Sequence, residues 1–290
     1  MEEKNMTKIG IIGGSGLYDM DGLEVVEERS VETPFGSPSD KLIFGKYNGI
    51  EIVFLARHGR GHVLAPHEIN YRANIYAMKS VGVEVIIAVS AVGSMKENIK
   101  PGDLVIIDQF IDRTKMRHQT FFENGIVAHV SFADPICETL RQKLLSLAKG
   151  LKTKVHDGGS YVCIEGPMFS SRAESNIFRS WGCSVIGMTG YQEARLAREA
   201  EICYVAISMS TDYDCWHEGE EDVDVLSVVE VMKNNVEKAK TLIKALLHDM
   251  PDLSSCHCRK ALEHAIMMDK KLIPDETKQR LKPIIGKYVK

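Results

Sequence analysis

The sequence predicts an α/β fold in which a mostly parallel, twisted sheet is covered by helices on both faces. Short apolar runs, such as 50–55 and 202–209, have the length and continuity of strands that are buried on both sides. Segments with helical periodicity lie between these runs. Strands that alternate with helices favour parallel pairing, because each crossover needs a connection long enough to return across the sheet.

The elements follow in a regular order along the chain. Strands are predicted at six apolar runs, namely 8–14, 50–55, 84–89, 103–107, 183–187 and 202–209. Helices are predicted at 70–81, 134–148, 172–181, 192–200 and 223–249. Ser171 and Glu174 have the spacing of a capping box at the start of one of these helices.

The chain shows one plausible break, at 251–255, and no internal repeat or low-complexity tract. Residues 1–250 are therefore expected to form one large domain. Two short helices are predicted beyond the break, at 258–268 and 275–281. The segment 251–290 is expected to be a helical extension that packs on the core or on a neighbouring subunit.

The composition excludes several classes of protein. Apolar residues make up 44% of the chain and charged residues 26%, as in an ordinary globular protein. A net charge of -4 argues against nucleic acid and against an anionic membrane as partners. We find neither a signal peptide nor an apolar run long enough for a membrane span, so we expect a cytoplasmic protein.

The seven cysteines are too few and too scattered for a secreted disulfide scaffold. The only cluster is Cys256-His257-Cys258. A structural zinc site normally needs four ligands, and no second pair of closely spaced cysteines is visible. We therefore expect no metal site, and instead free thiols or stabilising disulfides.

Groups that bind anions follow four of the predicted strands. Ser15 lies in a glycine-rich turn, Arg57 and His58 begin a basic segment, and Ser90-Ala91 and Thr189 follow two further strands. Each has a structural alternative, such as a tight turn or a surface ion-pair patch. Taken together they indicate a phosphate pocket, since an arginine fork and free amides both suit phosphate. The glycines do not fit a dinucleotide fingerprint or a P-loop.

Two carboxylates, Asp212 and Asp214, follow the last predicted strand. The carboxyl ends of strands are where open α/β sheets place their ligands. These acids could read an exocyclic amine or protonate a leaving base, and the structural alternative is a helix cap. Phe169 and Met188 could lie against a planar ring, although a lone Phe or Met is more often part of a core.

Several long motifs carry a resemblance to a known family. They are Gly-Gly-Ser-Gly at 13–16, Ala-Arg-His-Gly-Arg at 56–60, the run 101–114, the run 164–175 and Thr-Asp-Tyr-Asp-Cys-Trp at 211–216. From about residue 8 to residue 247, the chain closely resembles the methylthioadenosine phosphorylases, within the trimeric purine nucleoside phosphorylase family. This implies a purine nucleoside phosphorylase-like catalytic domain over 1–250 and a homotrimer or homohexamer.

The resemblance also implies a reaction. Inorganic phosphate, as co-substrate, would convert S-methyl-5'-thioadenosine to adenine and 5-methylthioribose 1-phosphate, without a metal or an organic cofactor. A broader purine nucleoside phosphorylase, acting on adenosine, inosine or guanosine, is the alternative. Carboxylates at 212 and 214 favour a 6-amino purine, because a 6-oxo purine would prefer an amide donor.

Motif by motif, the resemblance assigns roles to individual residues. Phosphate would be bound by Ser15, Arg57, His58, Ser90, Ala91 and Thr189. The nucleoside would be contacted by Phe169, Met188, Thr211, Val225, Val228 and Val229, with His129 and, as a further candidate, His62 arriving from an adjacent subunit. Asp212 would protonate N7 of the purine, and Asp214 would support it.

The chain departs from the family pattern in one place and matches only some of its members in another. Where the family usually has proline, this chain has Gln192, preceded by Tyr191, which we expect to alter the wall of the base site. The end of the chain resembles thermophilic members, in which a Cys-x-Cys pair can close a disulfide. Cys256 and Cys258 are the matching residues.

Overall fold

The structure, a computed structural model, describes residues 7–151, 153–217 and 225–289, with side chains of the last range from residue 230 onward. Within these ranges the strands form one mixed sheet of 11 strands, which confirms the predicted fold class. The strands are β1 (Lys8–Gly13), β2 (Leu23–Arg29), β3 (Leu42–Tyr47), β4 (Ile50–Ala56), β5 (Val83–Ser94), β6 (Leu104–Ile106), β7 (Gln109–Arg113), β8 (Val155–Asp157), β9 (Ser160–Ile164), β10 (Val185–Gly187) and β11 (Cys203–Asp212).

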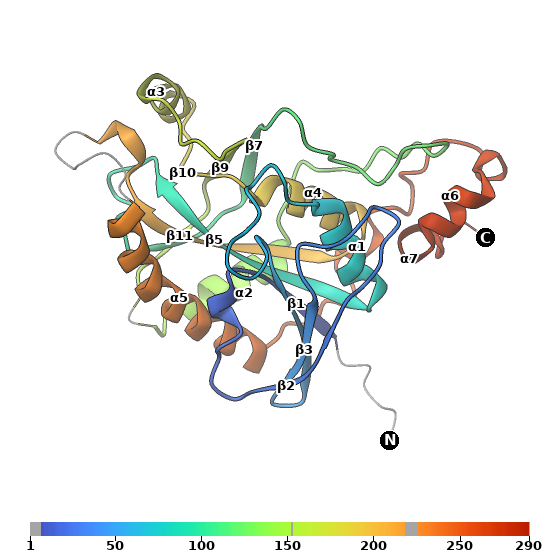
Figure 1. Cartoon of the computed structure of the whole chain (residues 1–290), viewed down its shortest axis with the longest axis horizontal. Helices are drawn as coiled ribbons and strands as arrows, with labels where there is room; N and C mark the ends of the chain where they lie inside the picture. Colours follow the sequence, from blue (N-terminus) through green and yellow to red (C-terminus); the bar gives the residue numbers. More distant parts are fainter. Residues whose placement is uncertain (1–6, 152, 218–224, 290) are drawn as a thin grey trace.

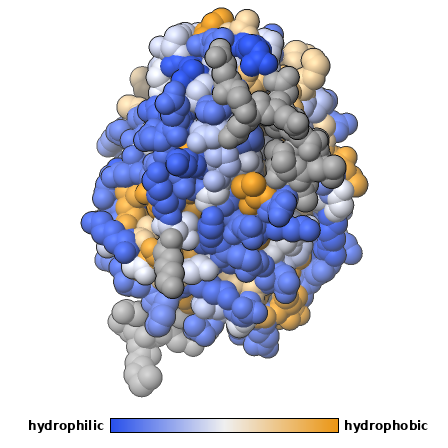
Figure 2. All heavy atoms as spheres, turned by 90° about the vertical axis from the view of Figure 1, so that its left-hand side faces the viewer, coloured by the Kyte–Doolittle hydropathy of each residue, from blue (hydrophilic) through white to orange (hydrophobic). Residues whose placement is uncertain are grey.

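Helices cover both faces of this sheet (Figure 1). They are α1 (Tyr71–Ser80), α2 (Glu138–Ala148), α3 (Arg172–Ser180), α4 (Gly190–Glu199), α5 (Val225–His248), α6 (Asp275–Arg280) and α7 (Lys282–Ile285). Helices α1 and α4 pack on each other above strand β5, and α2 and α5 pack on each other below it (Figure 1). The face that carries α3 and α5 is mostly hydrophilic where it is visible, with apolar groups in small patches (Figure 2). None of the helices in the described ranges is long and apolar enough to cross a bilayer.

The centre of the sheet is parallel, and it splits along strand β5. Strands β4, β1, β5 and β11 all run in the same direction. On one edge of β5, pairing with β1 ends at Ala88, and antiparallel pairing with β10 begins at Gly93. Residues 89–92 therefore line an opening between β1 and β10, while their other edge stays paired with β11.

Two predicted elements differ from the structure. Strand β5 continues to Ser94 rather than stopping at 89, because β11 pairs with it as far as Gly93. Ser90 and Ala91 thus lie inside a strand. The helix predicted at 258–268 is wrong, since only a short 3-10 turn, η3 (His257–Lys260), forms there. The rest of that segment bonds to another part of the chain, as when the amide of His129 donates to the carbonyl of Ala265.

The segment after residue 251 packs on the core of its own chain. Helix α7 lies against α1, and the hydroxyl of Tyr76 in α1 donates to the carbonyl of Arg280. Buried Glu201, just before β11, accepts from the amide of Leu262 and from the hydroxyl of Tyr288. These contacts join the start of β11 to both halves of the C-terminal segment.

Candidate active site

The carboxyl ends of four parallel strands form one edge of the sheet. Gly13 pairs with Ala56, so Ser15 and Arg57 leave β1 and β4 side by side. Asp212, at the end of β11, pairs with Gly93 of β5. The fold therefore places the phosphate candidates and the carboxylates along a single edge, which we name the strand-edge site.

Strand β10 approaches this edge from the opposite direction. Val185 pairs with Ser94 and Ile186 with Gly93, in antiparallel register. If this register continued past the strand, Thr189 would come opposite Ser90. Thr189 is buried and immediately precedes α4, whose N-terminus favours an anion through the helix dipole. Thus Thr189 reaches the opening in β5 although its strand runs the other way.

Arg57 is buried and held by its own chain. Its Nε and one terminal nitrogen donate to both carboxylate oxygens of Glu193, at 2.5 and 2.9 Å. The guanidinium also donates to the carbonyls of Val89 and Ile12. Burial alone would lower the pKa of Arg57, but the charge and hydrogen bonds of Glu193 raise it above its ordinary value. The guanidinium of Arg57 is therefore a fixed positive charge that is hydrogen-bonded to β1, β5 and α4.

His58 is a neutral imidazole in this environment. Its Nδ1 lies 2.8 Å from the carbonyl oxygen of Leu64, which can only accept, so Nδ1 carries the proton. Burial, together with the charges of Arg57 and Arg117, lowers the pKa of His58 to about 4. The free lone pair is therefore on Nε2. His62 stacks on this ring within the same chain, with 4.1 Å between the ring centroids.

The other phosphate candidates are less buried. Ser15 begins a short 3-10 turn and is exposed, as is Ala91. Ser90 is half-buried. Within the chain these groups border the opening in β5, where backbone amides and a hydroxyl can meet a ligand.

The two carboxylates are ordered by different partners. Asp212 accepts from the hydroxyl of Thr211 at 2.7 Å and from the amide of Asp214 at 2.8 Å. Asp214 accepts from the hydroxyl of Ser170 at 3.0 Å, and burial, with the charge of Asp212, raises its pKa. A Cβ at Gly93 would lie 2.9 Å from a carboxylate oxygen of Asp212. Sequence reasoning missed Gly93, whose lack of a side chain lets Asp212 and Asp214 approach β5.

The loop between β9 and α3 closes the site on the purine side. Ser171 caps α3 in the predicted capping box with Glu174, which is confirmed. Phe169, just before it, is 57% exposed and so is not a core aromatic. Half-buried Met188 lies against the same loop, because a Cβ at Gly166 would be 2.6 Å from its sulfur. Phe169 and Met188 therefore both lie on the purine side of the strand-edge site.

Arg117 is a buried residue that sequence reasoning missed. Its guanidinium donates to the carboxylate and the carbonyl of Glu165, to the carbonyl of Met188 and to the side chain of Gln192. The guanidinium of Arg117 thus connects three parts of the chain by hydrogen bonds, namely the loop after β9, the residue after β10 and helix α4. The sequence carried little signal for it, since a lone arginine in a polar segment is common.

Gln192, which replaces the usual proline, is fully buried in this network. Its carbonyl oxygen accepts from Arg117, and its amide donates to the hydroxyl of Thr114 at 2.7 Å. Tyr191 instead packs edge-on against Phe110 and Phe132. Gln192 in place of proline therefore adds hydrogen bonds to Arg117 and Thr114, next to Met188.

Comparison with known proteins decides the family. Residues 8–248 match the profile described as "Phosphorylase superfamily". The S-methyl-5'-thioadenosine phosphorylase of Geobacter sulfurreducens is 57% identical over 282 residues, which are 97% of this chain and 99% of that protein. The protein of the same name from Hyperthermus butylicus is 52% identical over 263 residues, covering 89% and 95%.

The chain belongs to the S-methyl-5'-thioadenosine phosphorylase family. A methylthioadenosine phosphorylase from an antarctic soil metagenomic library has a solved structure with a TM-score of 0.90, at 44% identity, covering 97% of this chain and 99% of that one. A Schistosoma mansoni adenosine/methylthioadenosine phosphorylase mutant, solved in complex with methylthioadenosine, gives a TM-score of 0.84 at 35% identity, covering 90% and 99%.

The remaining residues expected around the nucleoside of a methylthioadenosine phosphorylase are the three valines and His129. The side chains of Val225, Val228 and Val229 lie outside the described residues. His129 is exposed and lies against the C-terminal segment, where it lines a cavity with Arg198. Apart from His129, none of the residues predicted to bind phosphate or nucleoside lines this cavity.

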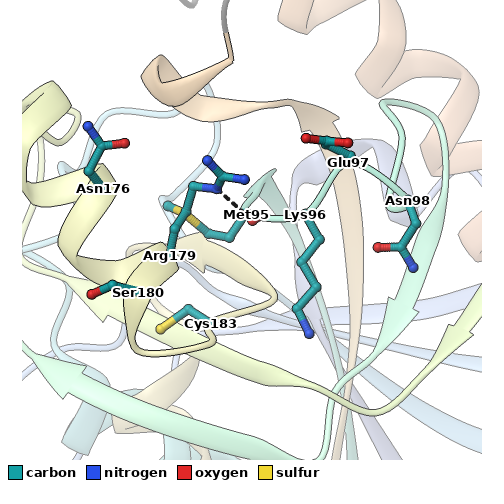
Figure 3. A pocket seen from close by; sticks show the side chains of 8 residues that line it. All are labelled: Met95, Lys96, Glu97, Asn98, Asn176, Arg179, Ser180 and Cys183. Carbon is teal, nitrogen blue, oxygen red and sulfur yellow. Dashed lines mark hydrogen bonds between the residues drawn. The ribbon is translucent and has the colours of Figure 1, made fainter.

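A second cavity, of about 650 Å3, lies beside the strand-edge site (Figure 3). It is lined by Met95, Lys96, Glu97, Asn98, Asn176, Arg179, Ser180 and Cys183. The side chain of Arg179 donates from Nε to the carbonyl of Met95 (Figure 3). Its guanidinium carbon lies 3.5 Å from the ring centroid of Trp216. Because none of the predicted site residues lines this cavity, we do not assign it to the phosphorylase reaction.

Proposed function

We propose that the chain catalyses phosphorolysis of S-methyl-5'-thioadenosine, releasing adenine and 5-methylthioribose 1-phosphate. Membership of the family supports this, as do the methylthioadenosine phosphorylases that match nearly the whole chain. The observation that carries the proposal is the shared edge of β5, which borders Arg57 and Thr189 on one side and Asp212 on the other. No observation favours the broader range of purine nucleosides.

On the phosphate side, the fixed charge of Arg57 attracts the anion, and Ser15, Ser90, Ala91 and Thr189 supply hydroxyl and amide donors. The neutral ring of His58 presents the lone pair of Nε2. It can accept a hydrogen bond from the P–OH group of monohydrogen phosphate, which keeps its proton and directs its unprotonated oxygens toward the ribosyl ring. A dianion near C1' stabilises the positive charge that grows there as the bond to the purine breaks.

On the purine side, negative charge grows on the leaving base. The carboxyl of Asp212 would donate a proton to N7 and so neutralise that charge, while the backbone amide of Asp214 donates to Asp212 and orients it. Phe169 and Met188 flank the ring, and Thr211 lies beside it. Val225, Val228 and Val229 would surround the apolar 5' group, together with His129 of an adjacent subunit. His62, the further candidate for that role, stacks on His58 of its own chain and would therefore contribute to the site of the same subunit.

The assembly and setting belong to the same proposal. We infer a homotrimer or homohexamer, since exposed His129 lies with the C-terminal segment rather than at the strand-edge site of its own chain. The reaction needs phosphate as co-substrate and no metal or organic cofactor. A cytoplasmic enzyme of methionine and purine salvage, without nucleic acid or membrane partners, fits the composition.

A substrate panel tests the proposal. Purified enzyme is given methylthioadenosine, adenosine or inosine, with and without phosphate, and the released base is measured. We expect phosphate-dependent release of adenine, fastest from methylthioadenosine. Hypoxanthine released from inosine at an equal rate would refute the 6-amino preference, and binding without turnover would refute catalysis.

A further inference from the structure

Four cysteines that are far apart in the sequence meet in the fold. Cys137 precedes α2, Cys203 begins β11, and Cys256 and Cys258 belong to the C-terminal segment. Their four sulfur atoms all lie within 4.8 Å of one another, and all four residues are buried. We name this group the cysteine cluster. Sequence spacing showed only the Cys256/Cys258 pair. The second pair of cysteines consists of Cys137 and Cys203, which are 66 positions apart in the sequence.

The spacing of the sulfurs suits a tetrahedral metal. Zinc–thiolate bonds of about 2.3 Å in a tetrahedron separate neighbouring sulfurs by roughly 3.8 Å. The sulfurs of Cys137 and Cys256 lie 3.6 Å apart, close to that edge length. Four thiolates at such distances repel one another strongly unless a cation lies between them.

The surroundings favour thiolates and a closed site. Cys137 stands at the N-terminus of the 11-residue helix α2, where the helix dipole stabilises an anion. Buried Arg198 and exposed Lys260 line the adjoining cavity with His257 and one carboxylate, Asp134, so most of the charged groups next to the cluster are basic.

We propose that Cys137, Cys203, Cys256 and Cys258 bind a structural zinc ion, which fastens the C-terminal segment to β11 and α2. Four protein ligands complete the preferred coordination of zinc and leave no position for a substrate. Cys203 is the first residue of β11 and Asp212 the last, which puts roughly 30 Å of extended strand between the cluster and the strand-edge site. The ion therefore takes no part in phosphorolysis, and the proposal does not rest on the proposed function.

Disulfides are the competing use of the same sulfurs. The family resemblance pairs Cys256 with Cys258, but in the structure all seven cysteines are free thiols. Two disulfides within the cluster would leave only Cys163, Cys183 and Cys215 reactive. A zinc site instead keeps all four sulfurs reduced and releases them when the metal is chelated.

The metal content of the full-length protein tests the proposal. The protein is purified without chelator or added reductant, and its metals are measured by mass spectrometry. Thiols are then counted in denaturant with EDTA. We expect about one zinc per chain and seven reactive thiols. The Cys203→Ser variant and the Cys256→Ser/Cys258→Ser double variant should each lose at least nine-tenths of the zinc. Cys183→Ser, which removes a buried thiol outside the cluster, should keep it.

Three results would overturn the zinc assignment. Only three reactive thiols, without metal, would show two disulfides. Seven reactive thiols in a protein that binds no zinc when titrated against a chromophoric chelator would show a simple thiol cluster. Iron in place of zinc would show a different site. If Cys203→Ser does not fold, the wild-type metal content and the double variant in the C-terminal segment still decide the question.

Discussion

On the phosphate side of the strand-edge site, Arg57 is buried among strands and a helix and is clamped by Glu193. On the purine side, Asp212 and Asp214 are ordered by short contacts to neighbours, and Phe169 on the adjoining loop is largely exposed. The first arrangement holds a charge in one place before any ligand arrives. The second presents an exposed ring on a loop. The anion site is therefore preorganised by the sheet, whereas the base site is completed by a loop.

The largest expected effect falls on the proton donor. Asp212→Asn keeps the shape and one acceptor oxygen, which can still accept from the amide of Asp214, while its NH2 must donate to the hydroxyl of Thr211. The variant removes the acid, and general acid catalysis contributes on the order of 100- to 10,000-fold. We expect kcat for adenine release to fall by at least 100-fold, with little change in the melting temperature. Steady-state assays at saturating phosphate measure this. An unchanged kcat would remove Asp212 from that role.

The second prediction concerns the clamp on Arg57. Glu193→Gln leaves a buried cation without its charge partner, which should cost on the order of 3–5 kcal/mol of unfolding free energy. We also expect a higher KM for phosphate, because the guanidinium loses its position. Glu165→Gln, on the purine side, removes a carboxylate that is partly exposed and should cost only about 1–2 kcal/mol.

Denaturant titrations of the two glutamine variants provide the comparison. Equal losses for both variants would contradict the idea that the phosphate side is the more rigid of the two.

A pH effect is expected at the far end of α4. Burial raises the pKa of Glu199 from an ordinary value of 4.5 to about 7. Between these values the folded state holds a proton that the unfolded state releases, so the unfolding free energy decreases as pH rises through this window. Glu199→Gln should remove that decrease, which is up to about 3 kcal/mol. Unfolding curves at several pH values measure the slope, and an unaltered slope would exclude Glu199 as its source.

The smallest effect is expected on the exposed loop. Phe169→Ala removes a ring that is 57% exposed, so the unfolding free energy should change by about 0.5 kcal/mol or less. The KM for methylthioadenosine should rise by about 5- to 10-fold, as the loss of one stacking contact of about 1 kcal/mol requires. The KM for phosphate should stay the same, and a shift in it would show that the two sides are coupled.

Much of the architecture could be predicted, because buried parallel strands are recognisable as continuous apolar runs. Strands β1, β4 and β11 were found in this way, as was the capping box at Ser171. Strand β2 was not, since nearly all of its residues are exposed. The segment 258–268 also misled, because its backbone forms short turns with bonds between residues three apart, and residues 265–267 then pair with the chain around His129.

Local patterns and long motifs were enough to predict the α/β class, the family and the residue types of the site. Which distant residues lie together became known only from the folded chain. It joined Glu193 to Arg57, Ser170 to Asp214, Arg117 to Gln192, and Cys137 and Cys203 to the Cys-x-Cys pair. The physical reason is that charge pairing and sulfur clustering depend on distance in space, which strand order and register set and which linear spacing does not encode.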